Sequence, residues 1–369
     1  MPAKAHNSSL FESFAKQNKD VWQRIAAQET ESDNPLKILS WKSENDLQFF
    51  PYYDAGDVTK LQYLDNLRLT VGENSFSGNR KWLNAPSVTT DNETTANKIS
   101  LVHLNQGADG LFFDIKTEIN FEKLLLNIEW NYCSLFFHSE NQHLLSLSDF
   151  LRRKKGNMIS GALFWDTIPK KSDVELFIND FREFRSLGIV IHKSDAISEI
   201  TEALLAGVRC IESFKSSFDL NEIFNAITFS IEVNQNFFGS IAKLKALRML
   251  WYQVSQAYEL KYFHPSDLCI HARSESWTDE KFQPHGNMLK ATTASMAAII
   301  GGCDVLTVLP EDGQQSMMNR ISRNVSSILR EESQFNKVAD PLAGAFAVDV
   351  MVDTFAREAW KSFQSKVKL

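Results

Sequence analysis

The sequence predicts an α/β fold: a (β/α)8 barrel of the TIM-barrel class, preceded by an N-terminal helical and extended arm. Three observations support this prediction. Short apolar runs alternate with longer amphipathic stretches along most of the chain. The runs are rich in β-branched and aromatic residues without clean alternation, which is typical of strands buried on both faces. The chain has 369 residues, 43% of them hydrophobic, which is enough for a barrel of about 250 residues and an appendage.

The first 80 residues are predicted to form the arm, and residues 81–369 the barrel. The arm contains an amphipathic stretch, Leu10–Ala26, followed by two short extended runs around Leu36–Trp41 and Leu47–Phe50. The large apolar residues of the amphipathic stretch recur at near-helical spacing: Phe11, Phe14, Trp22 and Ile25. This aromatic stripe has no place in the barrel, so the arm is the predicted site of subunit contacts.

Eight apolar runs are predicted as the barrel strands. They are Gly110–Ile115, Tyr132–His138, Gly161–Asp166, Gly188–His192, Ala226–Val233, Leu268–Ala272, Cys303–Leu309 and Gly344–Val348. Asp340-Pro341 and Gly344 are interpreted as a turn that enters the last of them. Because strands and helices alternate, the strands should pair in parallel. Closure into a barrel is the simplest arrangement, and an open doubly wound sheet is the alternative.

Helical patterns fill the gaps between the runs. They cover Phe121–Glu129, Leu144–Lys154, Asp173–Phe184, Ala196–Ser213, Phe237–Tyr258, Asn287–Ile300, Met317–Glu332 and Asp349–Phe363. In the clearest of them, one apolar stripe leads us to expect Lys243, Lys245 and Arg248 to turn away from its centre. Arg320 and Arg323, with two nearby glutamates, are interpreted as a solvated, ion-paired helix face.

Composition excludes several classes of partner. The net charge is −7, from 39 Lys and Arg against 46 Asp and Glu, and no basic run is present, so neither a nucleic acid nor an anionic membrane is expected as a partner. No apolar run approaches the roughly 20 residues of a membrane span. Four separated cysteines, with no C-x-x-C pair, indicate free thiols and a cytoplasmic location: Cys133, Cys210, Cys269 and Cys303.

Standard catalytic and ligand-binding motifs are absent from the sequence. Neither a phosphate-binding glycine loop nor a zinc-protease, paired-cysteine or G-x-S-x-G pattern occurs. The histidines lack ligand spacing, so no metal site is expected. Polar residues at predicted strand ends are the remaining candidates, and they are His138, Asp166, His192, Glu232, His271, Arg273 and Glu311–Asp312. Four of them are the candidate substrate-pocket residues: His271, Arg273, His192 and Asp166. For each one, a structural hydrogen bond is the more frequent role.

Four long segments resemble the adenosylcobalamin-dependent acyl-CoA mutase family. They are NFFGSIAKLKALRMLW (Asn236–Trp251), HARSESW (His271–Trp277), NMLKATTASMAAIIGGCDVLTVLP (Asn287–Pro310) and RISRNVSSILREESQFNKVADPLAGAF (Arg320–Phe346). The likeness spans roughly Trp82 to Trp360. Ser40–Asp57 and Asn105–Ile115 specifically resemble the small, non-catalytic subunits of methylmalonyl-CoA mutase.

The resemblance implies a barrel whose catalytic homologues pass the pantetheine arm of the substrate along the axis. The chain departs from the catalytic pattern at several positions. A tyrosine and its preceding arginine fall near Ser87 and Ala85, and an arginine-threonine-histidine-serine run becomes Cys269–Ala272. The glycine-tyrosine-histidine run after the fourth strand is missing, and Lys116–Glu118 replaces a further substrate loop. The D-x-H-x-x-G motif whose histidine binds cobalt in this family does not occur.

These departures predict a chain without its own catalytic residues, cofactor-binding residues or cobalamin-binding domain, either naturally separate from that domain or trimmed. The leading hypothesis is a non-catalytic component that stabilises a catalytic mutase chain in a heterodimer, and a homodimer is also possible. The alternative is a stand-alone acyl-CoA binder or enzyme with a site rebuilt at the strand ends. Whether the chain is itself an enzyme stays open.

Overall fold

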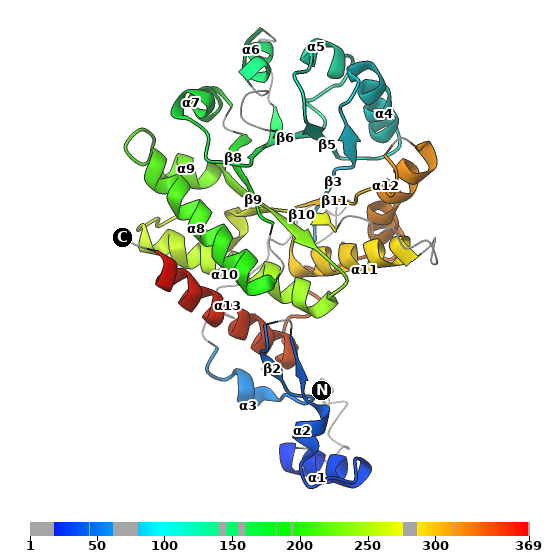
Figure 1. The fold of residues 1–369 in the computed structure, drawn as a ribbon, viewed down its shortest axis with the longest axis vertical. Helices are drawn as coiled ribbons and strands as arrows, with labels where there is room; N and C mark the ends of the chain where they lie inside the picture. Colours follow the sequence, from blue (N-terminus) through cyan, green and yellow to red (C-terminus); the bar gives the residue numbers. More distant parts are fainter. Residues whose placement is uncertain are drawn as a thin grey trace, which may run out of the picture.

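Figure 1 shows a ring of parallel strands surrounded by helices, with a separate group of small elements below it. This is a computed structural model. It describes residues 18–43, 45–61, 80–139, 145–153, 159–181, 183–192, 195–275, 286–313 and 315–367. The predicted amphipathic stretch at 10–26 therefore lies partly outside the described residues.

The main sheet is parallel, with strand order β3-β11-β10-β9-β8-β7-β6-β5-β4. Its strands are β3 (Leu83–Asn84), β4 (Ser87–Thr89), β5 (Gly110–Ile115), β6 (Ser134–Ser139), β7 (Ser160–Trp165), β8 (Phe184–Val190), β9 (Ile227–Val233), β10 (Cys269–Ser274) and β11 (Val305–Thr307). The seven predicted strands between residues 110 and 309 are therefore confirmed, with shifted ends.

The two ends of the sheet meet at Ala85 and Pro86. β3 pairs with β11 and β4 pairs with β5, and only these two residues separate β3 from β4. The Ala85 amide donates to the Leu306 carbonyl at 3.0 Å, and the Pro86 carbonyl accepts from the Phe112 amide at 3.0 Å. The sheet thus closes into a barrel, with residues 83–89 acting as one interrupted strand.

The predicted strand at Gly344–Val348 is wrong. Helix α13 (Phe346–Lys366) begins there instead, and Gly344 has a left-handed φ of 82° in the preceding turn. The missing barrel strand is residues 83–89, which the sequence pattern did not reveal. Its apolar residues are interrupted by Asn84, Pro86 and Ser87. The segment is therefore recognised as a strand by its hydrogen bonds to both neighbouring strands and not by its hydrophobicity.

The helices lie outside the ring. They are α4 (Glu93–Asn105), α5 (Phe121–Leu124), α6 (Leu145–Arg153), α7 (Lys171–Asp180), α8 (Ala196–Phe214), α9 (Leu220–Ala226), α10 (Phe237–Ala257), the 3-10 turn Pro265–Asp267, α11 (Gly286–Gly301), α12 (Ser316–Glu331) and α13. Helices α4 and α9 were not predicted. Side chains of Asn92, Asp195 and Asn236 accept from amides in the first turns of α4, α8 and α10, so ordinary N-caps begin these helices.

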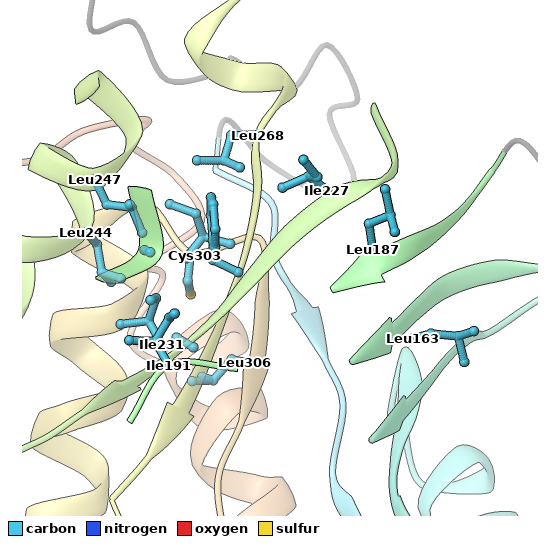
Figure 2. Close-up of a cluster of buried hydrophobic side chains, with 14 of the residues drawn as sticks. Leu163, Leu187, Ile191, Ile227, Ile231, Leu244, Leu247, Leu268, Cys303 and Leu306 are labelled. Atoms are coloured by element: carbon cyan, nitrogen blue, oxygen red, sulfur yellow. The ribbon is translucent and has the colours of Figure 1, made fainter. Parts of the chain in front are cut away.

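Hydrophobic residues fill the layer between the strands and the helices. Figure 2 shows Leu244 and Leu247 of α10 beside Ile231 and Cys303, all members of one buried cluster. Cys133, Cys210 and Cys303 are buried and Cys269 is half-buried, and all four thiols are free.

Helix α10 is buried on all sides from Gly239 to Arg248, which corrects the expected orientation of its cations. Lys243, Lys245 and Arg248 are each no more than 5% exposed, because α13 packs over α10 as an additional layer (Figure 1). Lys243 pairs with Glu199 of α8 and Lys245 pairs with Asp340. These cations therefore join the helix layers and do not form a solvated face.

Arg248 and Arg323 are both buried. Arg248 donates to the carbonyls of Pro265, Leu268 and Gly302 at 2.6–2.8 Å and to Asp304 at 2.7 Å. Arg323 is 4% exposed and donates towards His103 at 3.4 Å. The prediction of a solvated face is therefore wrong for Arg323, which is turned towards His103 of α4.

The described elements of the arm are α1 (Lys19–Glu29), α2 (Pro35–Leu39), β1 (Trp41–Lys42), β2 (Gln48–Phe49) and α3 (Ala55–Val58). They lie outside the barrel, with α3 in contact with α13 and α1 at the far end of the arm (Figure 1). The run around Leu36 is helical and not extended, because Pro35 begins a short capped turn. The Phe49 ring, 2% exposed, lies 6.2 Å from Phe355 of α13. Asn45 donates to Asp195 at 2.7 Å, which ties the hairpin to the barrel.

Candidate functional site

The barrel axis is filled by side chains that point inward from alternating strand positions. On β7, Phe164 and Ala162 face inward, whereas Leu163 between them joins the outer hydrophobic layer. The inner cluster consists of Ala85, Phe112, Phe136, Ala162, Phe164 and Val305. We call this cluster, with His271, the axial plug.

His271 lies within the plug among three phenylalanines. Its imidazole ring stacks on Phe112, with centroids 4.9 Å apart and an angle of 19° between the planes. The centroid distances to Phe164 and Phe136 are 5.3 Å and 6.3 Å. The side chain is fully buried. Four aromatic rings, one each from β5, β6, β7 and β10, therefore occupy the interior of the barrel.

A chain of hydrogen bonds fixes the His271 ring. Thr307 Oγ1 donates to the Ala85 carbonyl at 2.7 Å, so it must accept from His271 Nε2 at 2.9 Å. Nδ1 is then unprotonated and accepts from Ser230 Oγ at 2.9 Å. Burial, together with the charge of Arg273, lowers the pKa of His271 to about 3. His271 is therefore neutral, with both ring nitrogens occupied.

Above the plug, His138 bridges two carboxylates at the carboxyl ends of the strands. Its Nδ1 lies 3.0 Å from Asp114 Oδ1 and its Nε2 lies 3.0 Å from Asp166 Oδ1. Burial alone would lower the pKa of His138, but the hydrogen bonds and charges of the two aspartates outweigh it and the pKa is raised. For Asp114, burial opposes the effect of His138, and the net pKa is lowered. His138 thus holds a proton between two carboxylates.

Arg273 occupies the other half of the mouth. Its guanidinium lies 3.4 Å from both Glu232 Oε2 and His192 Nδ1, and its Nε is buried without a hydrogen-bond partner among the described residues. Burial, and then the Arg273 charge, lowers the pKa of His192. We call the six groups the mouth network: Asp114, His138, Asp166, His192, Glu232 and Arg273.

The structure brings three of the four candidate pocket residues together in this network: Asp166, His192 and Arg273. His271 lies in the plug beneath them. Asp114 was missed by sequence reasoning, although it is the penultimate residue of the GLFFDI run and so stands at a strand end. Glu311 lies apart from the network and accepts from Asn287 at 3.3 Å.

Several positions at which this chain departs from the catalytic family pattern lie in the plug, against it or at the mouth above it. Ala85 belongs to the plug itself, and Cys269 packs against it. Lys116 lies 3.8 Å from Asp114 at the mouth. The barrel therefore does not fit the adenosyl group and pantetheine arm that the resemblance implies for its catalytic homologues, since aromatic rings fill the space they would need.

Among the residues that the structure describes, no group of three or more His, Cys, Asp or Glu side chains is arranged to hold a metal ion. No described helix is both long enough and apolar enough to cross a bilayer.

The fold and site define an α/β barrel with a plugged axis and a charged mouth. A family model described as methylmalonyl-CoA mutase matches residues 186–368. The methylmalonyl-CoA mutase small subunit of Porphyromonas gingivalis is 29% identical over 96% of this chain and 64% of its own length. That of Streptomyces virginiae is 31% identical over 46% of this chain and 28% of its own length.

The chain is thus a homologue of methylmalonyl-CoA mutase small subunits, and the resemblance inferred from its motifs is confirmed. It spans less than two thirds of the length of either relative. A solved structure of Rhizobium etli pyruvate carboxylase superposes with a TM-score of 0.41 at 13% identity, covering 98% of this chain and 33% of that one. The barrel assignment rests on the strand order and not on this likeness.

Proposed function

We propose that this chain is a non-catalytic component of a methylmalonyl-CoA mutase. In this proposal it pairs with a catalytic chain that interconverts methylmalonyl-CoA and succinyl-CoA in the cytoplasm, and it binds no adenosylcobalamin itself. The observation that carries the proposal is the axial plug. Phe112, Phe136 and Phe164 occupy the path along which catalytic homologues are expected to pass pantetheine.

Opening that path is energetically unfavourable. Removing one buried phenylalanine side chain from a packed core costs about 3–5 kcal/mol. A substrate would have to displace three such rings together with His271, whose two hydrogen bonds to Ser230 and Thr307 would be broken. The combined cost of displacing these side chains is comparable to the free energy of unfolding of a whole domain. Passage of pantetheine along the axis is therefore incompatible with the folded barrel.

The arm supports the partner-binding part of the proposal. Several of its large apolar side chains are exposed: Ile25 by 47%, Ile38 by 57%, Trp41 by 43% and Phe50 by 44%. Exposed apolar clusters with aromatic members are typical of protein interfaces. Phe49 anchors the arm to α13, which holds these residues in a fixed orientation for a partner.

Size-exclusion chromatography with light scattering tests this function. The purified chain is mixed with the catalytic methylmalonyl-CoA mutase chain of the same organism, and we expect a one-to-one complex. Deleting residues 1–30, which removes Ile25 but leaves Ile38, Trp41 and Phe50, should weaken the complex while the barrel stays folded by circular dichroism. Two separate peaks from the intact chains would contradict the proposal.

A second candidate function is ligand binding at the mouth. It is favoured by one observation, the convergence of Asp166, His192 and Arg273 from three different strands. In this alternative a CoA ester binds at the rim without entering the axis. Saturable binding that is lost in Arg273→Met would favour it, and unchanged binding in that variant would exclude this site.

A further inference from the structure

Three successive strands of the barrel end in the same pattern, two aromatic residues followed by a titratable one. The runs are FFD on β5, FFH on β6 and FWD where β7 ends. Because side chains alternate along a strand, the first aromatic residue and the titratable residue of each run point to the same side. The first aromatic residues are the plug phenylalanines. The titratable residues therefore stand above the plug, at the mouth: Asp114, His138 and Asp166.

The two hydrogen bonds of His138 require a charged imidazolium. Nδ1 lies 3.0 Å from Asp114 Oδ1, and Nε2 lies 3.0 Å from Asp166 Oδ1. An ionised carboxylate only accepts hydrogen bonds, and a neutral imidazole has a single N–H. Both bonds therefore form together only when both ring nitrogens carry a proton. Once His138 is neutral, one of the two carboxylates faces a nitrogen lone pair and its bond is lost.

The bond to Asp166 is the one that gives way. Asp114 belongs to β5 and lies directly opposite His138 in the sheet register. Asp166, in contrast, is the first residue after β7, and its side chain is 47% exposed. Thr167 and Ile168, which follow it, are exposed as well. Asp114 is thus fixed by the sheet, whereas Asp166 is free to turn towards solvent.

The other charged and titratable groups around His138 leave it as the group that titrates near neutral pH. Burial lowers the pKa of both His192 and His271, so both are neutral where His138 is still charged. For His138 burial is outweighed by the bonds to the two aspartates, and its pKa is raised. The remaining neighbours are charges in pairs, namely Arg273 with Glu232 at 3.4 Å and Lys116 with Asp114 at 3.8 Å.

The segment that begins at Asp166 forms one wall of a cavity of about 250 Å³ between β8 and α8. Residues 166–169 line this wall, and residues 187–191 line the side formed by β8. Cys210 of α8 also lines the cavity, and it is 2% exposed. A movement of residues 166–169 would therefore change how far solvent reaches towards Cys210.

We propose that Asp114, His138 and Asp166 form a pH-sensitive latch on residues 166–169. While His138 is charged, the segment is held at the mouth and Cys210 stays covered. When His138 loses a proton, Asp166 is released, the segment moves and the cavity opens. The latch requires no partner chain, so it goes beyond the proposed function and is tested independently of it.

The reaction of Cys210 with N-ethylmaleimide tests the latch in the full chain. Its rate is measured by mass spectrometry at pH 5.5 and pH 8.5 in the wild type and in Asp166→Asn. The asparagine amide accepts from a charged His138 and donates to a neutral one, so in this variant the bridge persists at both pH values. Comparing the two proteins at the same pH also cancels the ordinary effect of pH on the thiol. We expect equal rates at pH 5.5 and a several-fold faster reaction of the wild type at pH 8.5.

Two controls separate release of the segment from loss of the fold. Cys133 and Cys303 are buried elsewhere in the protein, so each should react at the same rate in both proteins at either pH. His138→Gln has no titratable ring, so its Cys210 rate relative to Asp166→Asn should not change with pH.

Three results would overturn the latch. The first is an equal Cys210 rate in the wild type and Asp166→Asn at pH 8.5. The second is a parallel acceleration of all three cysteines in the wild type, which would indicate global unfolding. The third is a rise with pH in His138→Gln as large as that in the wild type, since His138 would then not be the group that titrates.

Discussion

The imidazole of His271 lies parallel to the ring of Phe112, 4.9 Å away, inside the closed barrel. In a TIM barrel, a histidine on a strand is expected near the reactive face. Here it is a core residue, because Ser230 and Thr307 satisfy its nitrogens and the plug covers its faces. The polarity of His271 therefore serves to join β9, β10 and β11.

Replacing His271 should destabilise the barrel. In His271→Ala the ring is lost from the plug and Ser230 loses its acceptor, so we expect the free energy of unfolding to fall by about 3 kcal/mol or more. Urea denaturation followed by tryptophan fluorescence measures the change. His192→Ala, at an exposed mouth position, is the control and should shift stability by no more than about 0.5 kcal/mol. Equal effects would show that His271 does not belong to the core.

The mouth network should make stability depend on pH. The pKa of His138 is raised in the folded state, above the value of about 6.5 for an unfolded histidine. Its stabilising contribution is therefore fully present below pH ~6.5 and is lost as the pH rises through the folded-state pKa. Between pH 5.5 and 8.5, we expect the wild type to lose more stability than His138→Gln. Parallel pH profiles for the two proteins would contradict this assignment.

Arg248 should be essential to the packing of α10. Arg248→Met removes the guanidinium that donates to three buried carbonyls and to the Asp304 carboxylate. We expect a loss of about 3–5 kcal/mol. Arg248→Lys should restore little, since a single ammonium cannot replace the forked guanidinium. Arg209→Met, an exposed arginine in a loose pair with Glu202, provides the comparison. Equal thermal midpoints for Arg248→Met and Arg209→Met would contradict this role of Arg248.

The sequence predicted the barrel because most strands are apolar on both faces. GLFFDI and GALFWD are examples, in which one alternate set of residues enters the plug and the other the outer layer. It did not predict the strand at residues 83–89, where backbone pairing with β5 and β11 replaces apolar content. It also misplaced Lys243, Lys245 and Arg248, because helical periodicity does not reveal that α13 covers α10.

The site could be predicted only in part. Strand-end position was sufficient to single out Asp166, His192 and Arg273, which do converge. Position along the strand did not distinguish His271 from them, because the difference between mouth and plug depends on strand tilt and on which face a side chain takes. The resemblance to the mutases gave the position of Ala85 but not the three phenylalanines that close the axis.

Isothermal titration calorimetry of the chain with methylmalonyl-CoA tests the closed axis most directly. The catalytic mutase chain, titrated under the same conditions, serves as the positive control. Because the axial plug leaves no path for pantetheine, we expect no saturable heat from this chain. Saturable one-to-one binding that survives in Arg273→Met would contradict the closed axis, since the ester would then have entered the barrel past Phe112 and His271.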